Sequence, residues 1–349
     1  MEYVLNKKIR DLKPYDPISG YYPIRLDANE SFLDVSNSIV SEILKASAFT
    51  SYNRYPDSKA IDLCNSFAAY YKIKPESVTA GNGSDELISV ICNAFLMKGD
   101  TMMTVSPDFS MYRFYASIVE AKSVEYQKNP DLTINIDAMI ADAKKYDAKM
   151  ILFSNPCNPT SLGLEKSDVR RLIASVDALV VVDEAYMDFW NESLLEEAEE
   201  YDNLIILRTC SKAFGMAGIR LGFAVANPTL TNALKAVKSP YNVNALTQKI
   251  GCTILNEHAF IHSSLAEIIA SKDTLYSEMK RVESSHVEEM HVYPSVTNFV
   301  FIRLRDAKKM YELLLRAGIA VRYMGDSLRV TAGSKKENAE FVKVFEKAI

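Results

Sequence analysis

Short apolar runs alternate with helical segments between residues 100 and 226, and this alternation limits the possible folds more than any other feature of the chain. Six runs are predicted strands, at 101–105, 123–126, 150–153, 179–182, 204–207 and 221–226. Between them, apolar residues recur with the spacing of a helix at 109–119, 136–146 and 166–175. Strands that are apolar throughout and joined by helices are typical of a mostly parallel sheet covered on both faces. The sequence therefore predicts an α/β fold.

Polar residues cluster directly after three of these strands. The segments are 155–160 (Asn-Pro-Cys-Asn-Pro-Thr), 183–186 (Asp-Glu-Ala-Tyr) and 211–212 (Ser-Lys). Ligands of parallel α/β sheets bind at the carboxyl ends of the strands. We expect one site to be built from these three segments.

Lys212 is the strongest catalytic candidate. It stands among small hydroxyl, thiol and glycine residues after an apolar strand, and Arg220 adds a second cation further on. Neighbouring cations and partial burial lower the pKa of a lysine, and the neutral amine then forms Schiff bases, the usual anchor of pyridoxal phosphate. The alternative is a solvated surface lysine, since lysine is rarely buried without a partner.

Asp183 ends an apolar strand, where an ionised carboxylate is costly to bury unless a cation meets it. A protonated pyridine nitrogen would be such a cation, and the aspartate would keep the cofactor ring protonated. Tyr186 and Asn158 could then hold the phenolic oxygen of the ring. Taken alone, Asp183 and Glu184 also fit an ordinary helix N-cap.

A glycine-containing stretch at 80–86 (Ala-Gly-Asn-Gly-Ser-Asp-Glu) precedes an apolar helix at 87–97. Glycines let the backbone bend, and the free N–H groups at a helix start bind anions. We expect a phosphate cup here, formed by five residues: Ser84, Asp85, Thr209, Ser211 and Arg220. A plain helix cap explains the stretch equally well.

The rest of the chain predicts three parts. Residues 1–35 show little periodicity and predict an extended N-terminal arm of the kind that often packs on a second subunit. Residues 36–260 are predicted to form the large domain, with further helices at 36–48 and 59–71. A helix at about 260–283 would link it to a small α/β domain at 261–349. The elements predicted in that small domain are strands 298–304, 319–322 and 327–331 and helices 307–317 and 335–348.

Composition narrows the functional classes. The 349 residues are 48% hydrophobic, enough for a sizeable core and two lobes. The net charge is 40 − 45 = −5 without a basic run, so nucleic acid is not an expected partner. Neither a membrane span nor a signal peptide is recognisable, which predicts a cytoplasmic protein without a membrane partner.

The cysteines and histidines predict no metal or disulfide. The five cysteines are odd in number, widely spaced and without a Cys-x-x-Cys pair, which predicts reduced thiols. His258 and His262 are four residues apart on a predicted helix, but no further ligand is placed with them.

Four motifs occur in order, at 82–86, 155–160, 183–186 and 211–222, and the last reads Ser-Lys-Ala-Phe-Gly-Met-Ala-Gly-Ile-Arg-Leu-Gly. The series resembles the fold-type I pyridoxal-phosphate aminotransferases and, within them, the histidinol-phosphate aminotransferases. The resemblance extends from Leu26 to Gly333. Its Ser-Lys-x-Phe-x-x-Ala-Gly-x-Arg element is highly specific for the family, whereas the substrate assignment is less specific.

The resemblance implies a role for each candidate. Lys212 would bind pyridoxal 5′-phosphate as a Schiff base and then move the proton between the substrate Cα and the cofactor. Asp183 would pair with the pyridine nitrogen, Asn158 and Tyr186 with the phenolic oxygen, and the five residues of the cup with the phosphate. Phe109 would stack on the ring, in place of the family's usual tyrosine. The implied substrate-binding residues are Arg329, Tyr15, Arg322 and Asn29.

The resemblance also implies a homodimer with shared active sites, because Tyr55 matches a tyrosine that reaches the phosphate in the neighbouring subunit. Two further departures from the family pattern concern other positions. At Ser31 and Phe32, near the substrate entrance, the chain departs from the family's usual Asn-Glu-x-Pro motif. Ser161 stands where the family has a glycine.

The implied activity is transamination between glutamate and a small phosphorylated substrate, with histidinol phosphate and imidazole acetol phosphate as first choice. An aminotransferase for an aromatic or another amino-alcohol-phosphate substrate is one alternative. A related decarboxylase of phosphorylated amino acids is a second. A non-catalytic binding or regulatory module is a third, which the set of Lys212, Asp183, Asn158, Tyr186 and Arg220 argues against.

Overall fold

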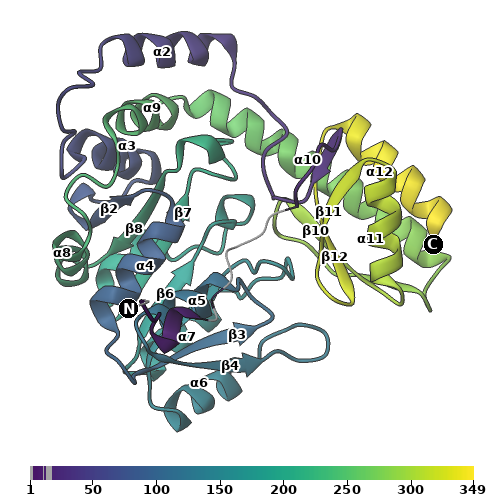
Figure 1. Cartoon of the computed structure of the whole chain (residues 1–349), viewed down its shortest axis with the longest axis horizontal. Coiled ribbons are helices and arrows are strands. Elements are labelled where there is room, and N and C mark those ends of the chain that lie inside the picture. The colour runs from purple at the N-terminus through teal and green to yellow at the C-terminus, as the bar shows by residue number, and fades with distance from the viewer. Residues whose placement is uncertain (1–2, 11, 13–17) are drawn as a thin grey trace.

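The computed structural model describes residues 3–10, 12 and 18–349. It contains two β-sheets, each with its own helices, in two units that helix α10 (His258–Ser284) joins (Figure 1). The predicted α/β fold with a mostly parallel sheet is confirmed.

The large sheet has seven strands in the order β2-β8-β7-β6-β5-β3-β4. The strands β7, β6, β5, β3 and β4 pair in parallel, whereas β8 is antiparallel to both of its neighbours. The bounds in sheet order are β2 (Val78–Gly81), β8 (Gly222–Ala226), β7 (Leu204–Thr209), β6 (Leu179–Asp183), β5 (Ala148–Ser154), β3 (Thr101–Ser106) and β4 (Lys122–Gln127). All six predicted strands are present, and β2 is an addition.

Helices cover both faces of this sheet because its strands are apolar on both sides. Met150 and Leu152 pack into one buried cluster, while the alternate residues Ile151 and Phe153 pack into another. The helices of the first cluster are α4 (Ser84–Phe95), α5 (Met111–Ile118) and α8 (Pro228–Val237). Those of the second are α3 (Ile61–Tyr71), α6 (Ile136–Lys145), α7 (Lys166–Ser175) and α9 (Ala245–Leu255), with α2 (Asn37–Ala48) touching it through Ile39.

The small unit contains a five-stranded sheet in the order β1-β11-β12-β10-β9. Its elements are β1 (Ile24–Leu26), β9 (Met290–Val292), β10 (Phe299–Leu304), α11 (Ala307–Arg316), β11 (Ile319–Tyr323), β12 (Ser327–Thr331) and α12 (Lys335–Ala348). Strand β1 belongs to the predicted arm but pairs in parallel with β11. The domain boundaries at residues 35 and 260 stay a prediction.

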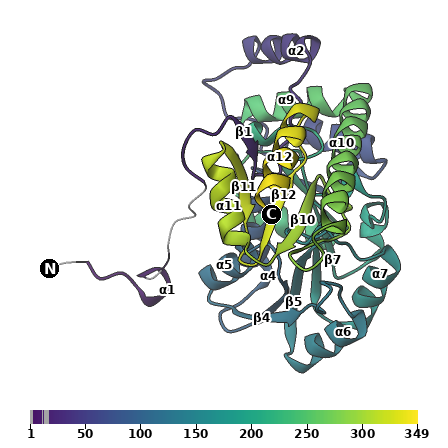
Figure 2. The ribbon, with the colours of Figure 1, turned by 90° about the vertical axis from the view of Figure 1, so that its right-hand side faces the viewer.

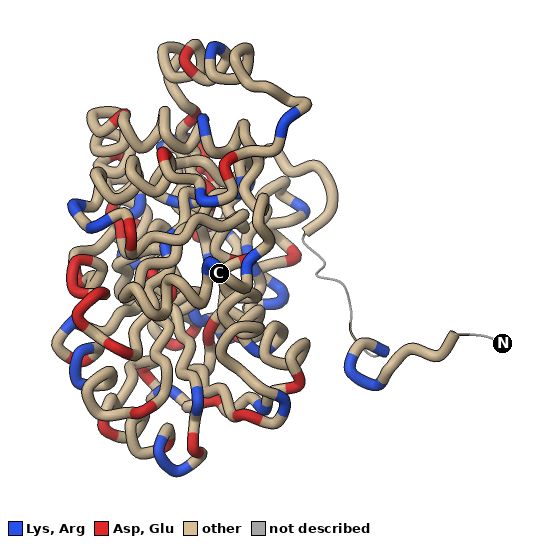
Figure 3. The backbone as a smooth tube through the Cα atoms, turned by 90° about the vertical axis from the view of Figure 1, so that its left-hand side faces the viewer, with Lys and Arg blue, Asp and Glu red and all other residues tan. Residues whose placement is uncertain are grey.

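The described residues before β1, namely 3–10, 12 and 18–23, lie outside both sheets. Their short helix α1 (Lys7–Arg10) is tied to α5 by a hydrogen bond of 2.9 Å from Lys8 Nζ to the Ile118 carbonyl, and Figure 2 shows it standing off the body of the molecule. Acidic and basic residues are interspersed along the chain on the side that Figure 3 shows. Within residues 3–10, 12 and 18–349, no helix is long and apolar enough to cross a membrane.

Candidate active site

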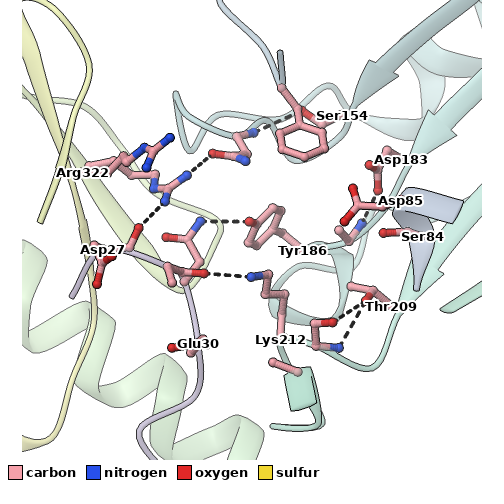
Figure 4. Close-up of a pocket in the computed structure, with 18 of the residues that line it drawn as sticks. Asp27, Glu30, Ser84, Asp85, Ser154, Asp183, Tyr186, Thr209, Lys212 and Arg322 are labelled. Atoms are coloured by element: carbon pink, nitrogen blue, oxygen red, sulfur yellow. Dashed lines mark hydrogen bonds between the residues drawn. The ribbon is translucent and has the colours of Figure 1, made fainter. Parts of the chain in front are cut away.

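A cavity of about 700 Å³ lies at the carboxyl ends of β5, β6 and β7 and also contacts the small unit (Figure 4). Most of the candidates predicted from the sequence line it. They are Asn29, Ser84, Asp85, Phe109, Asn158, Asp183, Tyr186, Thr209, Ser211, Lys212, Arg220, Arg322 and Arg329. The parallel strands bring these residues together, as the position of the motifs after the strands predicts.

Lys212 follows β7 and points into the cavity, where its Nζ donates a hydrogen bond of 2.9 Å to the Ala28 carbonyl. Burial lowers the pKa of Lys212 to about 8, and the nearby cations Arg329 and Arg220 contribute in the same direction against Glu30 and Asp85. A substantial fraction of this amine is therefore neutral near pH 8, as a nucleophile or general base requires.

Asp183 is the last residue of β6 and is 4% exposed. Its Oδ2 accepts a hydrogen bond of 2.8 Å from the Tyr112 hydroxyl, and its Oδ1 accepts one of 3.1 Å from the Ala185 amide. Burial raises the pKa of Asp183 to about 7 in spite of these bonds. Among the described residues no cation forms an ion pair with it. The site thus holds a buried carboxylate that a cationic ligand group would stabilise.

Two further hydrogen-bonded pairs line the cavity, Asn29 with Tyr186 and Asn158 with Arg329. Asn29 Nδ2 donates to the Tyr186 hydroxyl at 2.8 Å, which leaves the hydroxyl proton of Tyr186 available to a ligand. Arg329 Nη1 donates to Asn158 Oδ1 at 2.5 Å, and Arg329 Nη2 donates to the Asp27 carbonyl at 2.5 Å. The amide oxygen of Asn158 is therefore occupied, and its Nδ2 is the group it can offer to a ligand oxygen.

The start of α4 forms the predicted cup. Gly83 has φ +86°, and a Cβ added there would lie 2.9 Å from Arg220 Nη2, so a side chain would fill the cup. Arg220 itself has φ +53°, and its Nη2 lies 3.5 Å from Asp85 Oδ2. Thr209 Oγ1 donates to Ser211 Oγ at 3.0 Å beside them. Backbone N–H groups, hydroxyls and a guanidinium are the donors that suit a phosphate, and the phosphate cup stays a prediction.

A buried ion pair supports the site from the opposite face of the sheet and was missed from the sequence. Arg208 lies 3.0 Å from Glu184 and 2.8 Å from Asp188, and all three side chains are largely buried. Arg208 and Glu184 are the sequence neighbours of Thr209 and Asp183, so the pair ties together the ends of β7 and β6. The sequence indicated this contact only indirectly, because Arg208 and Glu184 directly adjoin Thr209 and Asp183 in the two motifs.

Among the described candidates, Tyr55 does not line the cavity. Tyr55 is exposed and stacks on Tyr241, with the ring centroids 4.4 Å apart, so it does not reach the site of its own subunit. Tyr15 lies outside the described residues.

The departures from the family pattern have local explanations. Ser161 has φ +63°, a conformation that favours glycine, and its hydroxyl donates to the Pro294 carbonyl at 2.8 Å. Ser31 Oγ accepts from the Leu33 amide at 3.1 Å, which holds the turn after Glu30. Phe32 lies against α10 and α12 rather than in the cavity. Phe109 retains an aromatic ring in the cavity wall.

In the part of the chain that the structure describes, no group of three or more His, Cys, Asp or Glu residues could hold a metal ion. His258 and His262 lie beside the ring of Tyr70 instead. All five cysteines are unpaired thiols.

The sequence matches the family described as aminotransferase class I and II over residues 22–345. It is 38% identical over 347 residues to the histidinol-phosphate aminotransferase of Clostridium novyi (strain NT), which covers 98% of this chain and 96% of the relative. The enzyme of the same name from Clostridium kluyveri (strain ATCC 8527 / DSM 555 / NBRC 12016 / NCIMB 10680 / K1) is 37% identical over 354 residues, covering 100% and 99%.

Solved structures show the same fold. The histidinol-phosphate aminotransferase of Sinorhizobium meliloti, in complex with pyridoxal-5′-phosphate, superposes with a TM-score of 0.88 at 20% identity over 99% of this chain and 97% of that chain. A single mutant of Thermus thermophilus aspartate aminotransferase gives a TM-score of 0.84 at 19% identity, with 100% of both chains covered. The protein belongs to the class I and II aminotransferase family and has the fold-type I architecture. It is an aminotransferase whose cofactor is pyridoxal 5′-phosphate.

Proposed function

We propose that this enzyme transfers an amino group from glutamate to imidazole acetol phosphate, which yields 2-oxoglutarate and histidinol phosphate, as a step of histidine biosynthesis. The proposal is supported by the names of relatives that are 37% and 38% identical over nearly their whole length. The observation that carries the transamination chemistry is the buried carboxylate of Asp183, which has a raised pKa and no cationic partner among the described residues, in the same cavity as Lys212.

The residues present fit the cofactor. Asp183 would pair with the pyridine nitrogen, since a protonated nitrogen is the cation that this carboxylate needs. The Tyr186 hydroxyl and Asn158 Nδ2 would donate to the phenolic oxygen, and Phe109 would lie on the ring. The remaining cup residues would hold the phosphate, namely Ser84, Asp85, Thr209, Ser211 and Arg220. When bound, the ring supplies an electron sink for the bond that breaks at the substrate Cα.

Lys212 would move the proton. A lysine with a pKa of about 8 holds and releases a proton near neutral pH, as a group that takes a proton from Cα and later returns one requires. The carbonyl of Ala28, 2.9 Å from Nζ, orients the amine in the cavity.

Arg329 would bind the carboxylate of glutamate. The residue is 8% exposed, and its guanidinium donates hydrogen bonds to Asn158 Oδ1 and the Asp27 carbonyl. A planar fork of donors matches a carboxylate or phosphate. Arg322 lines the same cavity and would meet the distal group of the second substrate, and Asn29 would contribute through Tyr186. Tyr15 stays a prediction for the distal group.

The active enzyme would be a homodimer. Tyr55 is 80% exposed and does not line the cavity of its own subunit, which supports the proposal that it reaches the phosphate cup of the partner. Exposed apolar side chains accompany it in the same region: Val40, Leu44, Phe49 and Tyr52. Exposed apolar patches of this kind mark protein interfaces. The cytoplasmic location stays a prediction.

Product analysis tests the proposal. The holoenzyme is incubated with histidinol phosphate and 2-oxoglutarate, and both glutamate and imidazole acetol phosphate are quantified. We expect equimolar products that depend on both substrates. A parallel incubation supplies a phosphorylated amino acid in place of histidinol phosphate. Release of carbon dioxide from that compound, with no glutamate formed in the first incubation, would contradict transamination and favour the decarboxylase.

A further inference from the structure

The acidic side chains that line the cavity differ in whether they already have a partner. Asp27 accepts two hydrogen bonds from Arg25, at 3.2 and 2.9 Å. Asp85 lies 3.5 Å from Arg220, and Asp183 accepts from Tyr112 and the Ala185 amide. Glu30 is the fourth acid, and within the described residues its carboxylate has no hydrogen bond or ion pair.

Glu30 stands at the exposed side of the cavity. Figure 4 shows it on the N-terminal segment near Lys212, away from Asp183 and Ser84. Its charge acts on the reacting group, since it opposes the lowering of the Lys212 pKa that burial and Arg329 cause. The turn after it is fixed by Ser31, whose Oγ accepts from the Leu33 amide at 3.1 Å. The turn that carries Glu30 is therefore ordered, and its side chain lines the same cavity as Lys212.

The two proposed amino donors present opposite chemistry to this carboxylate. Histidinol phosphate carries an imidazole, which donates a hydrogen bond from a ring N–H and becomes a cation when protonated. Glutamate carries a second carboxylate, which Glu30 repels. The cations that line the cavity suit phosphate and carboxylate groups, and they are Arg25, Lys212, Arg220, Arg322 and Arg329. An imidazole N–H needs an acceptor instead, and of the four acids that line the cavity Glu30 is the one without a hydrogen bond or ion pair to a described residue.

We propose that Glu30 is a specificity-determining residue that accepts a hydrogen bond from the imidazole of the substrate. This assignment rests on the proposed function, because it names the residue that binds the imidazole ring of the proposed substrate. A site built to bond a polar group discriminates against an analogue that lacks it. Glu30 therefore favours histidinol phosphate over an equally large substrate with a phenyl ring.

The test compares histidinol phosphate with phenylalaninol phosphate, its phenyl analogue, in wild type and Glu30→Gln. We expect the ratio of kcat/KM between the two substrates to fall about tenfold in the variant, because the glutamine side chain keeps an acceptor oxygen but loses the charge that strengthens the bond. Any effect of the lost charge on Lys212 cancels in this ratio, since both substrates use the same lysine. The half-reaction with glutamate should be unchanged or faster.

A control variant and a binding measurement accompany this comparison. Glu267→Gln, which removes one exposed charge from α10 outside the cavity, should leave the ratio unchanged. Calorimetric binding of both phosphates to Lys212→Ala, with and without Glu30→Gln, gives the same comparison without turnover, and the tenfold loss should appear there for the imidazole compound alone.

An equal fall for both phosphates, or a preference that survives in Glu30→Gln, would overturn this assignment while the proposed function stands. A wild-type enzyme that converts glutamate but not histidinol phosphate would instead overturn the proposed function and this assignment with it.

Discussion

Asp183 is the single residue whose environment departs most from that of an ordinary aspartate. Its carboxyl binds a proton in the folded apoprotein up to about pH 7, whereas an unfolded aspartate ionises near 3.8. The folded state therefore binds more protons between these two values, and its stability falls as pH rises from about 4 to 7. Asp183→Asn should flatten this part of the stability curve. Urea unfolding of both apoproteins at several pH values measures it, and an unchanged slope would contradict the burial argument.

Lys212 allows a second test at the same scale. Its pKa of about 8 lies well below the ordinary lysine value of 10.5, so its neutral fraction at pH 8 should far exceed that of surface lysines. A small amine-specific acetylating reagent should modify Lys212 of the apoprotein with a midpoint near pH 8, followed by mass spectrometry of its peptide. Lys335, on α12 outside the cavity, serves as the internal control. Equal pH profiles for both lysines would show that the site does not lower the pKa of the Lys212 amine.

The segment after β5 is the element where this chain departs most clearly from its family. Ser161 adopts a left-handed backbone conformation. It also links the two units, because its hydroxyl donates a hydrogen bond to the Pro294 carbonyl and its own carbonyl accepts one from the Val296 amide. Ser161→Ala should cost about 1 kcal/mol, because it keeps the unfavourable φ and loses the bond.

Ser161→Gly should be near neutral by the same reasoning, because relief of the backbone offsets the lost bond to within about 1 kcal/mol. Denaturant unfolding of both variants measures the difference. A glycine variant less stable than the alanine variant would contradict this account.

The elements themselves were largely predictable from the sequence. Strands such as β6 and β7 are apolar throughout and were predicted to within two residues of their ends. The short strands β1, β2 and β9 were not, because three or four residues carry little periodicity. Strand β1 in particular forms only by pairing with β11, far along the chain.

The site was predictable where a motif carries its chemistry, as at Lys212 and Asp183. Tyr112 was missed although its hydroxyl contacts Asp183, because nothing in the sequence says which face of α5 turns toward β6. Glu30 was likewise recognisable as an unpaired acid only after the partners of Asp27 and Asp85 were known. Such assignments depend on tertiary contacts rather than on local pattern.

Shared active sites would be a property of the whole molecule. If each site combines Lys212 of one subunit with Tyr55 of the other, hybrids of Lys212→Ala and Tyr55→Ala contain one intact site per dimer. Refolding an equal mixture of the two inactive or weakened variants should restore about one quarter of wild-type activity, because half of the dimers are hybrids. Activity no higher than the mean of the two parents would contradict sharing.

The most direct measurement follows the visible absorbance of the holoenzyme in the two half-reactions separately. Glutamate alone and histidinol phosphate alone should each abolish the band, 2-oxoglutarate should then restore it, and Lys212→Ala should lack the wild-type band from the start. An enzyme that responds to neither amino donor, or a band that is the same in Lys212→Ala, would contradict the account of this site as a transaminase centred on Lys212.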